Sequence, residues 1–346
     1  MIESSRFVNG CLAPSIPCVT EGDIEVAERI LGLRFDEPRR SILRSNESFD
    51  VQACPGSGKT TLLVAKLAIL ARKWPHVCRG MCVISHTNVA RREIETKLAG
   101  TGVDQRLLNY PHFVGTIHGF VNQFLALSFL RSEGYLVEMI DDDAHGDFSA
   151  RLLHTHNAYA TARNFLSRKE ANTPDRTIRG LRYEGPSLTL SSAAGALPCG
   201  PDSASYRILA EIKRTVVAKG IWRFDDMFAW AEKLLAEFPQ VCELVRWRFP
   251  AVFLDESQDT SELQAGLLEK VFPASACELR QRFGDSNQAI YDTGQAEAST
   301  DRFPAHGFRS VTDSQRFGSS IARLANPVAP APPEPELCGN GPRPLS

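Results

Sequence analysis

Short apolar runs alternate with stretches of helical periodicity over residues 49–120. Buried strands are predicted at 49–54, 80–86 and 113–116, and helices over 58–71, over 88–98 and from Ile117 onward. Strands that alternate with helices in this order favour a parallel sheet with helices on both faces. The first part of the chain therefore predicts an α/β domain.

The pattern changes between about residues 126 and 205, where an acidic triplet at 141–143 and turns rich in Ser, Ala and Gly separate short helical patches. Further on, helices are predicted at 206–218, 225–237, 241–247, 261–272 and 319–325, and strands at 251–255 and 278–285. The proline-rich end, from Asn326, predicts no regular element. These changes divide the chain into an N-terminal extension (1–34), a first part of the sheet domain (35–125), a mainly helical insertion (126–215), a second part of the sheet domain (216–326) and a tail (327–346).

Composition narrows the class of protein. Hydrophobic residues make up 43% of the 346, enough to build globular cores, and 39 basic against 41 acidic residues give a net charge of −2. Any binding to nucleic acid must therefore rest on local patches. The sequence lacks a long apolar segment and a signal-peptide pattern, so we expect a cytoplasmic protein without a membrane partner.

The nine cysteines form no CxxC pair and favour reduced thiols. Cys78 and Cys82 are close in sequence, but no second ligand pair follows. We therefore expect two partly buried thiols at the start of a strand rather than a metal site.

The sequence ACPGSGKT at residues 53–60 matches the phosphate-binding pattern G-x-x-x-x-G-K-[ST], with alanine at the first glycine position. Gly56 and Gly58 let consecutive amides curl around phosphate oxygens, Lys59 reaches the β and γ phosphates, and Thr60 can bind Mg²⁺. A glycine-rich turn without a ligand is the alternative. The predicted binding residues are Ala53, Cys54, Pro55, Gly56, Ser57, Gly58, Lys59, Thr60 and Thr61.

The strand at 251–255 ends in the sequence DESQDT. A strand-end aspartate such as Asp255 can bind Mg²⁺, and Glu256 beside it can orient or deprotonate the attacking water. Acidic residues at a helix N-terminus are the alternative. Farther on, GDSNQ is either a plain turn or places Gln288 to contact the terminal phosphate.

Seven segments in this order, ACPGSGKT, SHTNVARREI, GTIHGFV, FDDMFAWAEKLL, LDESQDT, FGDSNQAIYD and SQRFGSSIARLAN, resemble the N-terminal half of UvrD/Rep-like superfamily 1 DNA helicases. The resemblance spans about residues 35–326, and the paired segments DESQDT and GDxxQxIY are far more specific than the phosphate loop. It implies a RecA-like P-loop domain that binds ATP and Mg²⁺.

The resemblance assigns roles to residues of the ATP site. Thr60 and Asp255 would hold Mg²⁺, and Glu256 would activate water. Phosphate contacts and the sensing of the γ phosphate would involve Lys59, Gln258, Gln288 and Arg316. A guanidinium group neutralises developing phosphoryl charge, so the implied role of Arg316 agrees with its chemistry.

It also assigns contacts to single-stranded or partly duplex DNA. The candidates are Thr87, Asn88, Thr116, His118, Phe120 and Tyr291. Thr87 is equally suited to be a helix N-cap, and His118 taken alone is an ordinary residue at a helix start. Asp225 and Asp226 are expected to begin a helix rather than bind metal. Core positions are expected for Trp222, Phe224, Phe228 and Trp230.

Three departures limit the resemblance. Arg39 stands where the family has a glutamine that reads adenine, and the aromatic residue that usually follows GDxxQxIY is missing, although Tyr291 remains. The sequence also stops soon after Arg316, before a second RecA-like domain. We therefore expect ATP binding with weak hydrolysis and unwinding unless the missing domain is supplied, for which a second chain is a candidate partner.

The function predicted from the sequence is an ATP-dependent DNA helicase or translocase, with 3′-to-5′ polarity by family analogy. The alternative is a nucleotide-regulated DNA-binding module without processive unwinding. A small-molecule phosphotransferase is a third reading, which DESQDT and GDSNQAIY disfavour. The sequence does not choose among DNA repair, recombination and defence against foreign DNA.

Overall fold

The computed structural model describes residues 16–170, 175–286, 303–305, 307–328 and 337–341. Two compact units make up the chain. The first unit comprises Met1–Ile117 and Glu243–Ser346, and the second comprises His118–Cys242. The second unit thus extends beyond the insertion expected at 126–215 at both ends.

The first unit is built on a parallel sheet, whose six strands in the described residues lie in the order β10-β1-β9-β8-β2-β3. The strands are β1 (Phe49–Ala53), β2 (Met81–Ser85), β3 (Phe113–Thr116), β8 (Ala251–Asp255), β9 (Leu279–Gly284) and β10 (Arg309–Val311). Every residue of β2, β8 and β9 is buried, as expected for strands covered on both faces. The predicted α/β class is confirmed, and β10 is an additional strand at the edge beside β1.

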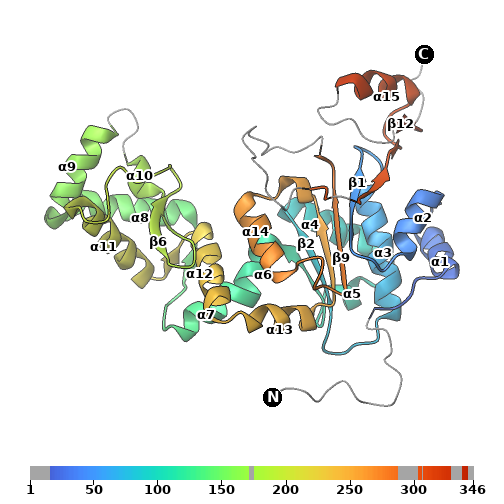
Figure 1. Cartoon of the computed structure of the whole chain (residues 1–346), viewed down its shortest axis with the longest axis horizontal. Helices are drawn as coiled ribbons and strands as arrows, with labels where there is room; N and C mark the ends of the chain where they lie inside the picture. The colour runs from blue at the N-terminus through green and yellow to red at the C-terminus, as the bar shows by residue number, and fades with distance from the viewer. Residues whose placement is uncertain (1–15, 171–174, 287–302, 306, 329–336, 342–346) are drawn as a thin grey trace. The chain divides into compact units, whose positions relative to one another are not determined.

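Helices cover both faces of this sheet (Figure 1). The unit contains α1 (Glu21–Leu31), α2 (Glu37–Arg44), α3 (Lys59–Lys73), α4 (Asn88–Ala99), α5 (Asp104–Leu107), α14 (Glu262–Val271) and α15 (Ser319–Ala325), with short helical turns η3 (Ser257–Asp259) and η5 (Asn326–Val328). The connections β1–α3–β2 and β2–α4–β3 both run toward β3 in the sheet, whereas β8–α14–β9 runs the other way. Because such crossovers are right-handed, α3 and α4 lie on one face of the sheet and α14 lies on the other. Helix α3 is buried continuously from Leu62 to Ala71 because α1 and α2 pack outside it.

Lys66 has a fully buried side chain within this apolar helix. Its ammonium donates to the carbonyl oxygens of Leu43 at 2.6 Å and Ser45 at 2.8 Å. These carbonyls lie at the end of α2, where helix carbonyls lack partners within the helix. Lys66 therefore fixes α2 against the helix that follows the phosphate loop.

The second unit is mainly helical, as the sequence predicts. It contains η1 (Asn122–Ala126), α7 (Leu127–Ser132), β4 (Met139–Ile140), α8 (Asp142–Thr155), η2 (Asn157–Tyr159), α9 (Ala160–Lys169), α10 (Arg176–Arg179), β5 (Leu181–Glu184), β6 (Thr189–Ser192), α11 (Ala204–Ala218), β7 (Ile221–Trp222) and α12 (Phe224–Glu237). Two helices, α6 (Ile117–Val121) and α13 (Gln240–Arg248), cross the boundaries between the units. The region of turns and helical patches expected before α11 also includes β6, which forms an antiparallel hairpin with β5.

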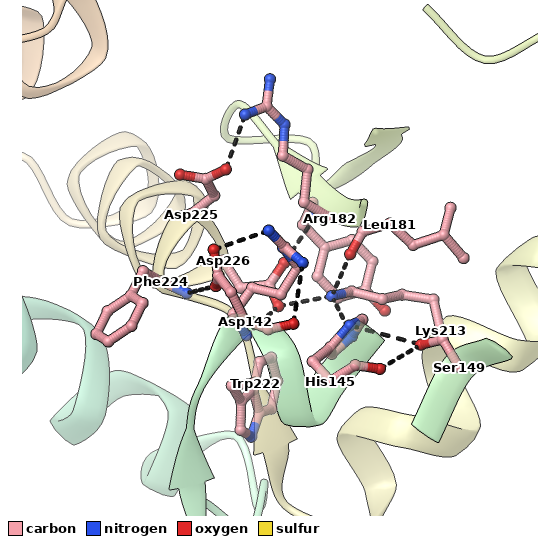
Figure 2. A network of polar contacts seen from close by, with 12 residues as sticks. Asp142, His145, Ser149, Leu181, Arg182, Lys213, Trp222, Phe224, Asp225 and Asp226 are labelled. Carbon is pink, nitrogen blue, oxygen red and sulfur yellow. Dashed lines mark hydrogen bonds and ion pairs between the residues drawn. The ribbon is translucent and has the colours of Figure 1, made fainter. Parts of the chain in front are cut away.

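A buried polar network joins α8, β5, α11 and the start of α12 (Figure 2). The side chains of Lys213 and Asp226 are 0% exposed and form an ion pair of 2.6 Å. Lys213 also donates to Leu181 O at 3.2 Å and contacts His145 Nε2 at 2.9 Å. Burial, and then the charge of Lys213, lower the pKa of His145 to about 2, so its neutral ring accepts from the ammonium.

The same network includes the first turn of α12, where Asp225 and Asp226 lie as expected for residues that begin a helix. Asp226 accepts hydrogen bonds from the amides of Arg223 at 3.0 Å and Tyr183 at 2.8 Å, and Asp225 pairs with Arg182. Within the described residues, no group of three or more His, Cys, Asp or Glu is arranged to hold a metal ion.

The expectations for four core aromatic residues and two thiols have mixed outcomes. Trp222, Phe228 and Trp230 are buried as predicted, whereas Phe224 at the first position of α12 is 39% exposed, so its core assignment is wrong. Cys82 is fully buried and Cys78 is exposed, so the two thiols differ in burial rather than both being partly buried.

The described part of the proline-rich tail contains a short strand, contrary to the expectation of no regular element. Residues Cys338–Gly339 form β12, which pairs in parallel with β11 (Asp313–Ser314). Among the described helices, none has the length and apolar character needed to cross a membrane.

Candidate active site

The phosphate loop, residues 53–60, connects β1 to α3. Gly56 and Gly58 have φ angles of 76° and 80°, a left-handed conformation that glycine adopts without steric cost. Gly58 is the N-cap of the 15-residue helix α3 and provides no side-chain cap. The amides of the first turn, including those of Lys59, Thr60 and Thr61, therefore lack intrahelical partners, which makes this helix end suited to phosphate oxygens.

The end of β8 brings an acidic pair to this loop. Lys59 Nζ lies 2.6 Å from Glu256 Oε2, although the two residues are far apart in the sequence. Gln258 Nε2 donates to the same Glu256 oxygen at 2.8 Å, and Gln258 Oε1 accepts from the amide of Asp285 at 3.0 Å. The predicted loop lysine, acidic residue and glutamine thus meet at the carboxyl end of the sheet.

Glu256 has an unusual backbone conformation, with φ of 52°. A non-glycine residue in the left-handed region carries strain, and such residues are often found at functional sites. This turn directs the Glu256 side chain to Lys59, immediately after the last residue of β8.

Asp255 has the features expected of a ligand for a divalent cation. Its side chain is buried, and its Oδ1 atom has no hydrogen-bond partner among the described residues. Burial, and then the negative charge of Glu256, raise the pKa of Asp255 to about 7. A cation such as Mg²⁺ would satisfy the unpaired oxygen and stabilise the ionised carboxylate. Thr60, in the first turn of α3, is buried as well and offers a hydroxyl oxygen.

Arg316, which the family resemblance predicts to contact the γ phosphate, lies against the phosphate loop. A Cβ atom built on Gly56 would lie 2.4 Å from Arg316 Cβ. The neighbouring amide of Gln315 donates to Gly56 O at 2.9 Å, and Ser314 Oγ donates to Pro55 O at 2.8 Å. Because the Arg316 side chain is exposed, its guanidinium is available to an anion at the loop.

Arg39 is a loop contact that the sequence does not reveal. Its buried guanidinium donates from Nη2 to Ser57 O and to Asp313 O, each at 2.9 Å, and pairs with Asp36. Arg39 therefore braces the phosphate loop against the segment that leads to Arg316. No local pattern connects these three distant segments, so only the fold identifies this role.

Two predicted residues, Gln288 and Tyr291, lie outside the described residues. Ahead of them, β9 ends at Gly284, where an added Cβ atom would lie 2.6 Å from Gln258 Oε1. The end of β9 therefore packs directly on Gln258.

The candidate DNA contacts in the first unit lie near the carboxyl ends of the sheet strands, as Asp255 does. Ser85 pairs in register with both Asp255 and Thr116, and Thr87 follows Ser85 closely. Thr87 and Asn88 are exposed at the start of α4, and Thr116 is half-buried at the end of β3. Thr87 Oγ1 also accepts from the Ala90 amide at 3.1 Å, so the residue is an N-cap whose hydroxyl proton can still be donated.

The candidate DNA contacts in the second unit have different environments. Phe120 is 0% exposed, so it offers no ring face for stacking on a base, and the stacking role implied for it is not supported. The half-buried His118 packs edge-on against Phe224 at 5.3 Å and Phe228 at 5.1 Å between ring centroids. Its aromatic neighbours fix the His118 ring, and Phe224 is the exposed aromatic residue of this group.

Comparison with known proteins agrees with this geometry. ATP-dependent DNA helicase UvrD1 of Mycobacterium tuberculosis is 24% identical over 292 residues, which cover 77% of this chain and 34% of the relative. ATP-dependent DNA helicase PcrA of Bacillus subtilis is 25% identical over 302 residues, with coverages of 80% and 37%. ATP-dependent DNA helicase srs2 of Schizosaccharomyces pombe is 24% identical over 292 residues, with coverages of 79% and 31%. The chain thus spans about a third of the length of these curated relatives.

The family model for the UvrD/REP helicase N-terminal domain matches residues 36–300, a range that contains the phosphate loop, β8 and the whole second unit. Since this match covers most of the chain and agrees with the parallel sheet and with the meeting of Lys59 and Glu256, the chain belongs to the UvrD/REP helicase N-terminal domain family.

Proposed function

We propose that this chain is the ATP-binding part of a DNA-dependent motor, which hydrolyses ATP and couples hydrolysis to movement along single-stranded DNA. The observation that carries the proposal is the contact of Lys59 and Gln258 with Glu256, directly after the buried Asp255. A phosphate loop alone would fit many classes of nucleotide-binding protein. The DNA part of the proposal draws on the relatives, whose names describe ATP-dependent DNA helicases.

In this proposal, nucleotide binding rearranges the ion pair of Lys59 and Glu256. Lys59 gives up the Glu256 oxygen that lies 2.6 Å away and donates to the β and γ phosphates instead. Glu256, released from the ammonium, then accepts a hydrogen bond from the attacking water and orients it toward the γ phosphorus. Gln258, which contacts Glu256 at 2.8 Å, holds the carboxylate in place.

Asp255 and Thr60 are the residues that would hold Mg²⁺, because one has an unpaired buried oxygen and the other lies in the first turn of α3. The cation would supply positive charge to the phosphate oxygens. Arg316, beside Gly56, would add a guanidinium to the charge that develops on the γ phosphate.

Single-stranded DNA would bind across the carboxyl ends of β2 and β3, where Thr87, Asn88 and Thr116 lie. Hydroxyl and amide side chains are suited to contacts with backbone phosphates, which position DNA without reading its sequence. Since these residues follow β2 and β3 and Asp255 ends β8, nucleotide and DNA would meet adjacent strands of one sheet. We propose 3′-to-5′ movement by analogy with the family.

Movement requires a second RecA-like domain, in the same polypeptide or in a second chain, because alternate opening and closing of a cleft drives such steps. A second candidate function is a nucleotide-regulated DNA-binding module, in which ATP changes the grip on DNA without processive unwinding. The observation that favours it is the register of Ser85 with Asp255, which places the strand before Thr87 and Asn88 directly beside the proposed nucleotide site within a single domain.

Fluorescence anisotropy of a labelled single-stranded oligonucleotide tests the DNA part of the proposal. We expect different affinities without nucleotide, with ADP and with a non-hydrolysable ATP analogue, and a several-fold weaker affinity for Asn88→Ala. Thr96→Ala, an exposed change on the same helix, is the matched control and should leave affinity unchanged. Absence of DNA binding in every nucleotide state would contradict the proposal and favour a small-molecule phosphotransferase.

A further inference from the structure

Residues 337–341 of the tail lie beside the segment that carries Arg316. Strand β12 pairs in parallel with β11, in the register Asp313 to Cys338 and Ser314 to Gly339. Three tail amides donate to this segment: Cys338 N to Thr312 O at 3.1 Å, Asn340 N to Ser314 O at 2.8 Å, and Gly341 N to Phe317 O at 2.9 Å. These bonds flank Arg316 on both sides in the sequence.

The same segment also contacts the phosphate loop. Besides the bonds of Gln315 and Ser314 to the loop, the amide of Cys54 donates to Val311 O at 3.0 Å and its thiol donates to Thr312 O at 3.3 Å. Residues 311–317 are thus hydrogen-bonded to both the phosphate loop and the tail.

Two glycines allow the tail to approach the backbone around Arg316 closely. A Cβ atom built on Gly339 would lie 2.3 Å from Gly318 C, and one built on Gly341 would lie 2.6 Å from Phe317 N and 2.8 Å from Arg316 C. Backbone atoms cannot move aside as the end of a flexible side chain can. Any side chain at Gly341 would therefore displace either the tail or the backbone at Arg316.

The start of the segment 337–341 is anchored independently. Asn326, which follows α15, accepts from the Leu337 amide at 3.0 Å and donates from Nδ2 to Leu337 O at 3.3 Å. This side chain pairs with both backbone groups of Leu337, immediately before β12. The segment 337–341 is consequently fixed both at its first residue and along the Arg316 segment.

We propose that residues 337–341 are a positioning element of the nucleotide site, which adds a strand beside β11 and so holds Arg316 against the phosphate loop. The inference rests on the proposed role of Arg316 at the γ phosphate, and it extends that role to a tail segment outside the family match at 36–300. Without the tail, the backbone on either side of Arg316 loses three amide donors and gains conformational freedom. The guanidinium would then be held less well over the phosphate, where small displacements are costly.

The test compares Gly341→Ala with Gly266→Ala, a glycine on α14 whose added Cβ atom meets nothing within 4 Å. The readout is the ratio of the affinities for a non-hydrolysable ATP analogue and for ADP, together with the single-turnover rate of hydrolysis. We expect Gly341→Ala to lower the ATP-to-ADP preference roughly 10-fold, the order of one lost charge-assisted hydrogen bond, with ADP affinity unchanged. Gly266→Ala should leave both affinities at the parental values.

Coupling with Arg316 separates positioning from general stability. If the tail acts through Arg316, the double variant Gly341→Ala/Arg316→Ala should show the same preference as Arg316→Ala alone. Additive losses, an equal loss of ADP affinity, or an unchanged preference in Gly341→Ala would overturn the inference. Asn326→Ala, which removes the anchor without adding atoms, provides the same test should Gly341→Ala fold poorly.

The two proposals fail in different ways. If Arg316→Ala and Lys59→Ala bind ATP as the parent does, the proposed nucleotide site is wrong. If Arg316→Ala loses the preference for ATP while both tail variants keep it, only the positioning role of the tail is wrong.

Discussion

Substitution of Glu256 by glutamine tests the ion pair at the nucleotide site. In the structure, Glu256 Oε2 accepts from Lys59 Nζ at 2.6 Å and from Gln258 Nε2 at 2.8 Å. The change Glu256→Gln keeps the size of the side chain but removes its negative charge. Lys59 then loses a competing partner, and the phosphates of ATP lose a nearby repulsive charge. Both effects favour ATP binding.

The magnitude follows from the burial of the pair. The side chains of Lys59 and Glu256 are 11% and 28% exposed, between a surface pair and a fully buried one. Surface pairs contribute about 0–1 kcal/mol and the breaking of buried pairs costs about 3–5 kcal/mol, so roughly 1–2 kcal/mol opposes ATP binding here. At about 1.4 kcal/mol per tenfold change, Glu256→Gln should bind ATP about 5- to 30-fold more tightly. Loss of the group that orients water should slow hydrolysis by roughly 10²–10⁴-fold.

The assay is a pair of measurements on one preparation: titration with a fluorescent ATP analogue and single-turnover hydrolysis of ATP. Glu25→Gln, the same change at an exposed position of α1, is the control and should match the parent in both. Unchanged ATP affinity in Glu256→Gln would show that the ion pair does not compete with nucleotide. Hydrolysis at the parental rate would show that Glu256 does not act on the water.

Three further predictions concern buried groups and the loop. Lys213→Met leaves the Asp226 carboxylate buried without its cation. It should lower the free energy of unfolding of the second unit by about 3–5 kcal/mol in urea titrations, and Asp226→Leu in the same chain should restore most of that loss. Burial and the charge of Lys213 lower the pKa of His145 to about 2 from its usual 6.5, so only the unfolded chain gains this proton between those values. The contribution of His145 to the stability of the second unit should therefore fall as the pH drops below about 6.5, by up to about 1.4 kcal/mol per pH unit, and His145→Gln should remove that part of the slope. Gly56→Ala places a Cβ atom at a φ of 76° and 2.4 Å from Arg316 Cβ, and should weaken ATP binding at least about 10-fold in the same titration.

Matched variants control these predictions. Lys219→Met, at an exposed position after α11, should leave the unfolding free energy unchanged, and equal losses in Lys213→Met and Lys219→Met would contradict the buried-pair argument. A pH slope in His145→Gln identical to that of the parent would show that His145 is not the titrating group. Parental ATP affinity in Gly56→Ala would show that the loop tolerates a side chain beside Arg316.

The sequence predicts those parts of the site that depend on local patterns. The phosphate loop and the acidic pair Asp255 and Glu256 each lie within one short segment, at the end of a strongly apolar strand. Their types and spacing therefore indicate the chemistry before the fold is known. The phosphate loop and the acidic pair meet because β1 and β8 are parallel strands, whose carboxyl ends lie on the same side of the sheet.

Contacts between distant segments could not be predicted in this way. Arg39 reaches Ser57 and Asp313 only because α2, the loop and β11 converge in the fold. Strand β12 forms in a proline-rich segment because β11 offers carbonyl partners. Local strand propensity cannot predict this pairing with a distant segment. From the sequence, Phe120 is a candidate DNA contact and Phe224 is expected to be a core residue. The packing of the second unit instead buries Phe120 and leaves Phe224 exposed.

The most direct test of the central proposal is the single-turnover rate of ATP hydrolysis by this chain, measured with and without single-stranded DNA. We predict hydrolysis that requires Mg²⁺, increases when DNA is added, and disappears in Lys59→Ala. A rate that DNA leaves unchanged would contradict a DNA-dependent motor, and a rate that survives Lys59→Ala would contradict the nucleotide site itself.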